Sequence, residues 1–476
     1  MATAKKITIN PISRLEGHGK VTIHLDENGE VTDARFHVTQ FRGFEKFCQG
    51  RSFEEMPIIT QRVCGICPVS HQLASAKACD AILGVEIPET AKSLRELEHM
   101  GQYIQSHALH FFYLASPDLL LGWDADPAIR NVVGVVEKFP EIATQGIYLR
   151  KFGQQIIAAL GGKRIHPSFA VSGGVSSTLS EEDRDNFLGR FEQAYEACRT
   201  GLNFMKDLVE KKPEEMKRFA NFSSKYMGLV DTEGRLNLYD GKLRIIDGEK
   251  KLLNEFEPSD YLEFIGEKVM PWSYMKFPFY IPAGWPDGYY RVGPLGRINA
   301  ADGLSTPLAQ EEFEQYHKTA SSGLRGATLL YHYARLIELL YGLERAEELL
   351  MNDNITNTDI RTTTPPVNEE GVGVIEAPRG TLIHHYEVDE YGKIQKVNLI
   401  VATGHNNMAM NRSIELVAKE YIKNGEVKEG ILNRVEGAIR AYDPCLSCAT
   451  HAIGQMPLKI QVHDFTGELL IEEQRD

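Results

Sequence analysis

Two Cys-x-x-Cys stretches stand at opposite ends of the chain: Arg62-Val63-Cys64-Gly65-Ile66-Cys67-Pro68-Val69-Ser70-His71 and Asp443-Pro444-Cys445-Leu446-Ser447-Cys448-Ala449-Thr450-His451. Cysteines three positions apart can point the same way from a helical turn. Two such pairs brought together make a cage of four thiolates, which are soft ligands that favour zinc, iron or nickel over magnesium or calcium. Because almost all of the protein lies between the pairs, the fold must form before the cage can close.

The composition indicates an ordinary globular protein with an acidic balance. A chain of 476 residues can bury a large core, and its length alone allows two or three domains. The formal net charge of −14 argues against nucleic acid or an anionic membrane as the main partner. The start lacks the apolar run of a secretion signal, and no stretch approaches the roughly 18 apolar residues of a membrane span. We therefore expect a cytoplasmic chain without a membrane span.

The cysteine count argues against a disulfide framework. The chain has an odd number of cysteines, 7, and four of them belong to the two pairs. Cys79 and Cys198 fall within helical patterns, so we predict that they are small buried side chains. Cys48 lies near the first pair and receives no assignment.

Hydrophobic periodicity predicts an α+β fold that is mainly helical, with β-hairpins. We predict helices over 70–83, 89–115, 144–160, 181–211, 309–351 and 411–440, and a short helix opened by a capping box at 52–55. Hairpins are predicted over 20–38, 229–255 and 380–403, and a strand near 458–462. The Pro- and Gly-rich residues 271–300 indicate irregular surface chain. We find no repeat or linker, which favours one domain over residues 1–451.

The spacing of the cysteines alone leaves the metal open. Asp443 and Pro444 are typical of a helix N-cap and first position, which would place Cys445 and Cys448 where a helix end favours thiolate. Closed structural zinc is the commonest use of two such pairs. Zinc ribbons, however, space their pairs some 15–20 residues apart, and a core this large needs no metal to hold it. An iron–sulfur cluster is a second alternative, but no other cysteine cluster supports an electron relay.

The two stretches resemble the two signatures of [NiFe]-hydrogenase large subunits. Further segments match in order, from about residue 7 to the C-terminus: Arg14-Leu-Glu-Gly-His18, Phe41-Arg-Gly-Phe-Glu45, Glu376-Ala-Pro-Arg-Gly380 and Val401-Ala-Thr-Gly404. The forms Cys-Pro and Leu-Ser-Cys-Ala-Thr-His are most similar to the soluble bidirectional, NAD(P)-linked branch, as are Gln105-Ser-His-Ala-Leu109 and Leu121-Gly-Trp-Asp124. The resemblance implies that family's fold, a central helical bundle with peripheral β-hairpins, and the reversible heterolytic cleavage of H2.

The resemblance also implies the ligands of the metal site. Cys64 and Cys445 would be terminal on nickel, and Cys67 and Cys448 would bridge nickel to an iron that carries one carbon monoxide and two cyanides. A nearby magnesium would be a further metal, for which the resemblance implies two ligands, Glu45 and His451. Magnesium prefers oxygen ligands, so Glu45 fits readily, whereas the histidine rests on the resemblance alone.

Further residues receive roles around this site from the resemblance. Arg379, with Pro378 beside it, would overhang the open metal position as a candidate proton acceptor, held by Asp443. Without its flanking motif, Arg379 would be interpreted as a surface ion-pair residue, and a lone Glu16 as solvated surface. In the family, Glu16 would carry the proton away from Cys445.

The last three implied positions concern hydrogen bonds. Thr403 would donate to a cyanide, and His71 to a bridging sulfur. The sequence departs from many relatives at Ser106, which stands before His107 where they have aspartate. That departure puts in doubt a carboxylate contribution at this point.

The chain carries no iron–sulfur relay and no Gly-x-Gly-x-x-Gly after a strand, so electrons must leave through partners. The resemblance implies a small subunit with iron–sulfur clusters, joined to a diaphorase with flavin that reacts with NAD(P). A ferredoxin-linked or electron-bifurcating complex is an alternative, and a non-catalytic scaffold with structural zinc is an alternative of another class. Residues 452–476 resemble a maturation peptide, which an endopeptidase removes after His451 once chaperones have inserted nickel.

Overall fold

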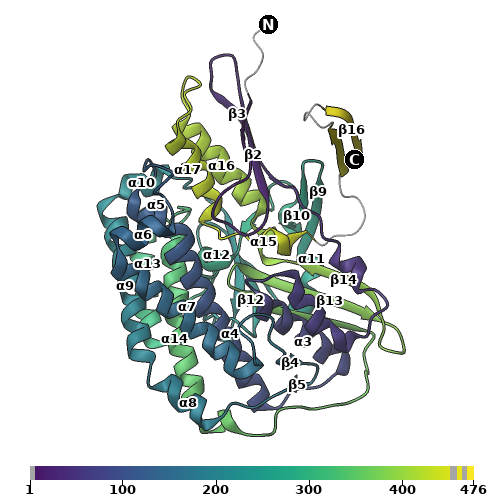
Figure 1. Ribbon diagram of the computed structural model, residues 1–476. Coiled ribbons are helices and arrows are strands. Elements are labelled where there is room, and N and C mark those ends of the chain that lie inside the picture. The colour runs from purple at the N-terminus through teal and green to yellow at the C-terminus, as the bar shows by residue number, and fades with distance from the viewer. Residues whose placement is uncertain (1–5, 451–457, 464–468, 476) are drawn as a thin grey trace.

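The computed structural model describes residues 6–450, 458–463 and 469–475. Its central element is helix α14 (Leu330–Met351), which is buried on almost every side, as expected for a helix inside a bundle. Helices α4 (Glu89–Leu109), α9 (Phe191–Lys211) and α13 (Pro307–Ala320) pack against it, and α7 (Pro140–Gly161) packs against α4 and α9. Together they form the left-hand part of the molecule in Figure 1.

Further helices connect and cover this bundle. They are α1 (Phe44–Cys48), α2 (Met56–Thr60), α3 (Pro68–Leu83), α5 (Ser116–Leu121), α6 (Val132–Lys138), α8 (Glu181–Leu188), α10 (Pro213–Arg218), α11 (Tyr261–Phe264), α12 (Gly293–Ala300), α15 (Ala402–His405), α16 (Asn407–Tyr421) and α17 (Glu429–Arg440). The expected helix at 70–83 is α3, which ends at Gly84 in the left-handed conformation.

Small sheets lie to the right of the bundle in Figure 1, so the predicted fold class is confirmed. Three strands pair in the order β1 (Lys6–Ile9), β2 (Gly19–Leu25), β3 (Val31–Val38), and three in the order β12 (Glu370–Ala377), β13 (Gly380–Val388), β14 (Ile394–Ile400). A four-stranded sheet has the order β11 (Tyr290–Arg291), β6 (Lys225–Val230), β7 (Lys242–Ile246), β8 (Leu252–Phe256). Two-stranded sheets are β9 (Ile265–Met270) with β10 (Ser273–Tyr280), β4 (Ala170–Val171) with β5 (Gly174–Val175), and β15 (Leu458–His463) with β16 (Leu469–Arg475).

The predicted hairpins at 20–38, 229–255 and 380–403 are confirmed, and β15 contains the expected strand near 458–462. Four of the predicted helical stretches are divided: 309–351 contains α13 and α14, 411–440 contains α16 and α17, and the other two are 181–211 and 89–115. A break at Gly189 and Arg190 separates α8 from α9, and the helix over 89–115 continues through a π-helical turn, His110–Ala115, into α5. The predicted end before Pro117 is wrong, because helical structure continues into α5 with Pro117 in its first turn.

Two further predictions are wrong. Ser52 makes no capping hydrogen bond with its side chain, although helix does follow it. Residues 271–300 are not irregular surface chain, because they contain β10 and the wholly buried helix α12. In α12, Gly296 packs so close to the Arg291 carbonyl that an added Cβ would lie 2.6 Å from its oxygen. The glycine therefore permits close packing here rather than marking a loop.

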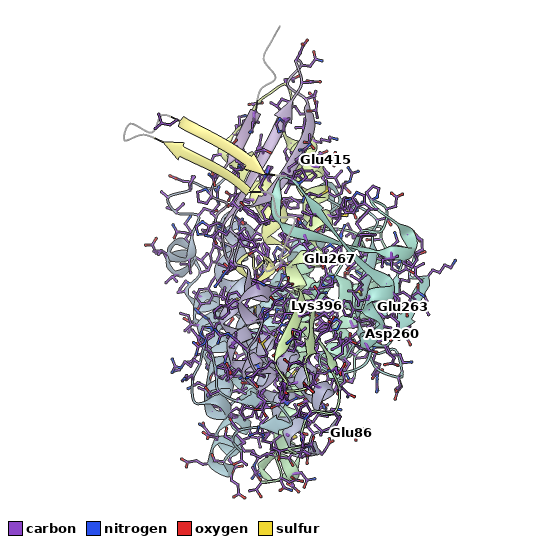
Figure 2. All side chains as sticks on the ribbon, turned by 90° about the vertical axis from the view of Figure 1, so that its right-hand side faces the viewer. Glu86, Asp260, Glu263, Glu267, Lys396 and Glu415 are labelled. Atoms are coloured by element: carbon purple, nitrogen blue, oxygen red, sulfur yellow. The ribbon has the colours of Figure 1, made fainter. Side chains whose placement is uncertain are left out.

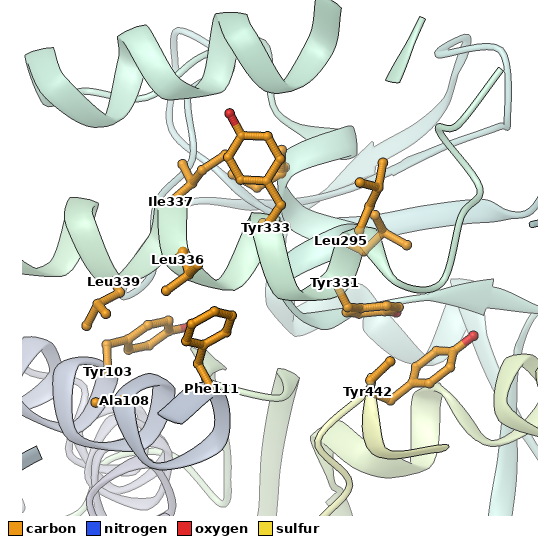
Figure 3. Close-up of a cluster of buried hydrophobic side chains, with 14 of the residues drawn as sticks. Tyr103, Ala108, Phe111, Leu295, Tyr331, Tyr333, Leu336, Ile337, Leu339 and Tyr442 are labelled. Carbon is orange, nitrogen blue, oxygen red and sulfur yellow. The ribbon is translucent and has the colours of Figure 1, made fainter. Parts of the chain in front are cut away.

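The core ties the segment before the second cysteine pair to the bundle. Figure 3 shows side chains of α14, α4 and α12 converging, with Tyr442 at one side. The rings of Tyr331 and Tyr442 lie 4.5 Å apart between centroids, a contact worth about 0.5–1.5 kcal/mol beyond the area buried. The chain that leads to Asp443 is thus held by packing on α14.

The surface reflects the acidic composition. On the face seen in Figure 2, Glu86, Asp260 and Glu263 are exposed acidic side chains from separate elements, while Lys396 is the labelled basic one. Among the described residues, no helix is both long enough and apolar enough to cross a membrane.

Candidate metal centre

The structure brings the four cysteines of the two pairs together. Their Sγ atoms all lie within 4.8 Å of one another, and all four residues are buried. The Sγ distances are 3.2 Å from Cys64 to Cys445, 3.5 Å from Cys67 to Cys448 and 2.9 Å from Cys445 to Cys448. None of the four is in a disulfide. This arrangement is the expected four-thiolate cage.

Each pair is held by short backbone turns. Cys67 is the N-cap residue of α3, with Pro68 at the first position, and Cys64 Sγ accepts hydrogen bonds from the N–H groups of Ile66 and Cys67. The predicted helix start at Asp443 and Pro444 is wrong. Asp443 has the left-handed φ of 55°, and a 3₁₀ turn begins only at Ser447. The Asp443 carboxylate does not cap a helix because it pairs with Arg379 instead.

The thiols of the cage differ in acidity. Hydrogen bonds from Cys445, Cys448 and Cys64 hold the pKa of Cys67 well below its ordinary value, and a hydrogen bond from His71 acts in the same direction. Burial raises the pKa of both Cys445 and Cys448 well above the ordinary value. Thiolate is the form that binds metal, so loading this cage releases protons.

Glu16 lies directly beside the cage. Its Oε2 accepts a hydrogen bond from Cys445 Sγ at 3.1 Å and another from the Ser447 N–H at 3.0 Å. The backbones of Glu16 and Cys445 form a parallel bridge. At the next residue, Gly17, φ is +87° and an added Cβ would lie 2.8 Å from Leu446 Cβ. The close approach of the two segments therefore requires glycine.

Arg379 and Asp443 form a buried ion pair next to the cysteines. Nη2 lies 3.0 Å from Oδ2 of Asp443, Nε donates to the Asp443 carbonyl at 2.7 Å, and Nη1 donates to Ser106 Oγ at 3.3 Å. Burial opposes the charged guanidinium, but Asp443 and the cysteines outweigh it and raise the pKa of Arg379. Arg379 therefore carries a fixed positive charge, and it meets the hydroxyl of Ser106 at the position that precedes His107.

Sequence reasoning missed the network that holds the Arg379 loop. Arg297 of α12 donates to Glu338 at 2.6 Å and to Glu376 at 2.8 Å, with all three side chains fully buried. It also donates to the carbonyls of Ala377 at 2.7 Å and Pro378 at 3.1 Å. Arg297 lies in residues 271–300, which the sequence predicted to be irregular surface chain. The contact could be found only from the structure, in which Arg297 is buried on helix α12.

A small cavity opens beside the cage. Its lining includes Cys67, Cys445 and Cys448 but not Cys64, together with His71, apolar side chains and two hydrogen-bond donors on other elements, Arg379 and Thr403. Thr403 Oγ1 accepts the Cys445 N–H at 2.9 Å, which leaves the hydroxyl proton for another acceptor. The apolar wall suits a small neutral ligand and the two donors suit small anions, so these residues fit an iron bound to carbon monoxide and cyanide.

The remaining predicted positions divide into described and undescribed residues. His71 is buried on α3, with Nδ1 3.1 Å from His384 Nε2. Glu45 is buried on α1, and its Oε1 accepts the Leu399 N–H at 2.9 Å. His451, the second expected magnesium ligand, lies outside the described residues.

Family models and individual relatives both identify the same protein family. The family model described as "Nickel-dependent hydrogenase" matches residues 42–127 and 238–451, and the one described as "HoxL-like" matches residues 6–41. The chain is 45% identical to the NAD-reducing hydrogenase HoxS subunit beta of Cupriavidus necator, over 99% of this chain and 100% of that protein. It is 49% identical to a subunit of the vhu F420-non-reducing hydrogenase of Methanocaldococcus jannaschii, over 88% of this chain and 100% of that protein.

A solved structure agrees with these relatives. An NAD⁺-reducing [NiFe]-hydrogenase in the H2-reduced state superimposes with a TM-score of 0.92 and 46% identity, covering 94% of this chain and 99% of that one. The soft donor set of four thiolates suits the nickel and iron that such an active site holds. The chain therefore belongs to the nickel-dependent [NiFe]-hydrogenase family, as a large subunit.

Proposed function

We propose that this chain is the catalytic subunit of a cytoplasmic [NiFe] hydrogenase that cleaves H2 reversibly and heterolytically and exchanges electrons with NAD(P) through partner subunits. The observation that carries the proposal is the cage of four cysteines with both Glu16 and Arg379 against it. A structural zinc site needs neither a carboxylate on one of its thiols nor a buried arginine beside it.

In this proposal the cysteines divide into two kinds. Cys64 and Cys445 are terminal nickel ligands, and Cys67 and Cys448 bridge nickel to an iron with one carbon monoxide and two cyanides. The cavity beside the cage is lined by both proposed bridging cysteines, Cys67 and Cys448, and by the proposed terminal ligand Cys445. When bound, the metal pair polarises H2 as a Lewis acid.

The chain's own residues handle the proton and the charge. Glu16 Oε2 lies at hydrogen-bond distance from Cys445 Sγ, so it takes a proton from that sulfur and passes it outward. The Ser447 N–H fixes the orientation of the carboxylate. Arg379 stays protonated in the resting site, so its part is a fixed charge and donor toward the cyanides, with Thr403 as the second donor.

A magnesium ion belongs to the same proposal. Glu45 supplies one carboxylate, and His451 is the second ligand. The support is that Glu45 is a buried carboxylate, held at the C-terminal end of β14 by the Leu399 N–H, and that magnesium prefers oxygen ligands. Removal of residues 452–476 after His451 by an endopeptidase, following nickel insertion by chaperones, completes the site.

NAD(P) is the proposed final acceptor. The support is the similarity over almost the whole chain to a subunit named for NAD reduction and to a solved NAD⁺-reducing enzyme. A small subunit with iron–sulfur clusters, followed by diaphorase subunits with flavin, carries the electrons between this chain and the nucleotide.

A ferredoxin-linked or electron-bifurcating complex is the second candidate. The observation that favours it is the 49% identity to a relative named F420-non-reducing hydrogenase, which is not named for NAD. The two candidates share the metal site and differ only in the partner that accepts electrons.

Elemental analysis of the purified native complex, combined with an acceptor assay under H2, tests the proposal. We expect about one nickel per chain and H2-dependent reduction of NAD or NADP. Nickel with reduction of ferredoxin but of neither nucleotide favours the second candidate. Zinc without nickel overturns the hydrogenase site and supports the scaffold.

A further inference from the structure

A buried hydrogen-bond chain leads away from Cys67 through two histidines and a tyrosine. Nδ1 of His71 lies 3.1 Å from Nε2 of His384, and Nδ1 of His384 lies 2.6 Å from the Tyr386 hydroxyl. That hydroxyl lies 2.9 Å from Oγ of Ser75. None of these four side chains is more than 1% exposed. They therefore bond to one another within the protein rather than to bulk water.

The residue spacing in one helix and one strand places these four side chains together. His71 and Ser75 are one turn apart on α3, so they lie on the same face. His384 and Tyr386 are two residues apart on β13, so they point to the same side of the sheet. Strand β13 packs against α3, so His384 and Tyr386 of the strand meet His71 and Ser75 of the helix. No local sequence motif predicts the contact, because it depends on the register of the strand against the helix.

One end of the chain is a sulfur that can only accept hydrogen bonds once it binds metal. Because Nδ1 of His71 faces His384, Nε2 is the nitrogen left for Cys67, which lies one helical turn before His71 and lines the same cavity. A thiolate has no proton to give, so His71 must donate from Nε2, and the neutral imidazole then accepts at Nδ1.

The same argument sets the donor and acceptor roles of the other residues in the hydrogen-bond chain. His384 must donate from Nε2 to His71 and accept at Nδ1, so the rotatable Tyr386 hydroxyl gives its single proton to His384 at 2.6 Å rather than to Ser75 at 2.9 Å. Burial raises the pKa of Tyr386 well above its ordinary value, so the phenol keeps the proton that it donates. If the order were reversed, a bare nitrogen of His71 would face the thiolate, and two acceptors would meet without a proton between them.

We propose that His384 and Tyr386 are positioning residues that hold His71 in the Nε2–H tautomer, and thereby fix the hydrogen bond on the sulfur of Cys67. The proposal rests on the proposed function, in which Cys67 bridges nickel and iron. A hydrogen bond to a metal thiolate withdraws electron density from the sulfur and the metal. His384 and Tyr386 thus influence the electron density at the metal site, although neither residue touches metal or substrate.

Infrared spectroscopy of the purified complex measures the stretching bands of carbon monoxide and cyanide, whose positions report the electron density at the metal site. In Tyr386→Phe, which removes one oxygen without changing the ring, we expect these bands to move to lower wavenumber while nickel per chain stays unchanged. In His384→Leu we expect a larger shift of these bands than in Tyr386→Phe. We also expect H2 oxidation to fall by roughly 10- to 100-fold, as for other residues that hydrogen-bond to metal ligands. His384→Gln keeps an N–H donor for His71, so it should restore most of the wild-type spectrum.

Tyr261→Phe is the matched control. The Tyr261 hydroxyl lies 2.8 Å from Nδ1 of His385, which neighbours His384 on the same strand but points to the opposite face. This variant removes an equivalent tyrosine–histidine bond that does not lead to Cys67, and its bands should match the wild type. Equal shifts in Tyr261→Phe and Tyr386→Phe, or none in His384→Leu, overturn the inference. Absence of these bands from the wild-type complex instead overturns the proposed function.

Discussion

Oε2 of Glu16 lies 3.1 Å from the Sγ of Cys445, although 429 residues separate the two in sequence. The backbone bridge between these residues and the hydrogen bond from the Ser447 N–H hold the carboxylate against the sulfur of Cys445. The position of Glu16 therefore follows from the main chain around the second cysteine pair, and a change of its side chain alters chemistry with little effect on structure.

Glu16→Gln should block proton transfer while leaving nickel in place. Glutamine has the same size and its amide oxygen still accepts from Ser447, but it cannot hold a proton at neutral pH. A positioned acid or base contributes typically about 10²–10⁴-fold, so H/D exchange measured by mass spectrometry of the gas should fall by at least about 100-fold. Glu86→Gln, at an exposed carboxylate far along the sequence, is the control (Figure 2). Unchanged exchange in Glu16→Gln would remove this residue from the proton route.

Asp443→Asn should destabilise the protein because it leaves the Arg379 charge buried without its carboxylate. Both side chains are only 3% exposed, and breaking such a buried pair costs about 3–5 kcal/mol. Urea unfolding measures the loss. Asp124→Asn breaks the exposed pair with Arg434 and should change stability by less than about 1 kcal/mol. Equal midpoints for the two variants would contradict this account.

Arg297→Met should cost stability and activity together. It strands the carboxylates of Glu338 and Glu376 in the core, at about 3–5 kcal/mol, and it removes the donors that hold the Ala377 and Pro378 carbonyls before Arg379. The triple variant that adds Glu338→Gln and Glu376→Gln should regain stability, because no charge is left unpaired, but not H2 oxidation. Recovery of both quantities in the triple variant would show that Arg297 does not position the Arg379 loop.

The sequence predicted the parts of the site that lie in continuous segments. The two cysteine pairs, Glu16, Arg379 and Asp443 each stand in a short run whose residue types suit their chemistry, and the structure brings these residues together. The sequence did not predict His384, Tyr386 or Arg297, because their roles depend on how β13 and α12 pack. A period-two pair of a histidine and a tyrosine directly after the Arg379 segment was the one available signal.

Errors of element prediction share a cause. Proline and glycine predict an end to regular structure over 271–300, whereas Gly293 and Gly296 let α12 approach Arg379 and Arg291 closely. In the same way Asp443 and Pro444 have the residue types of a helix start, but the buried charge of Arg379 takes the carboxylate. Local propensity was overridden in both places by a contact distant in sequence.

Acid should destabilise the fold through buried neutral histidines such as His107. Burial lowers the pKa of His107 to about 4, although its Nε2 lies 3.0 Å from Glu338. An unfolded histidine has a pKa of about 6.5, so between these values the unfolded chain binds the extra proton and stability falls as the pH falls, by roughly 3 kcal/mol for this residue. Urea midpoints from pH 7 to pH 4 should therefore decline less steeply in His107→Gln than in the wild type. Parallel curves would assign the acid sensitivity to other groups.

Active enzyme should end at His451. Thr450 is buried and its carbonyl accepts the Arg42 N–H at 3.1 Å, so the chain before the proposed cleavage point lies inside the protein, next to the segment that carries Glu45. Cleavage there frees a carboxylate beside the proposed magnesium ligands, and an anionic group is favourable close to a divalent cation. Intact mass spectrometry of nickel-loaded, active complex should give a large subunit that lacks residues 452–476, while a nickel-free preparation retains them. A fully active complex whose large subunit keeps the whole mass of 53.5 kDa would rule out this processing step.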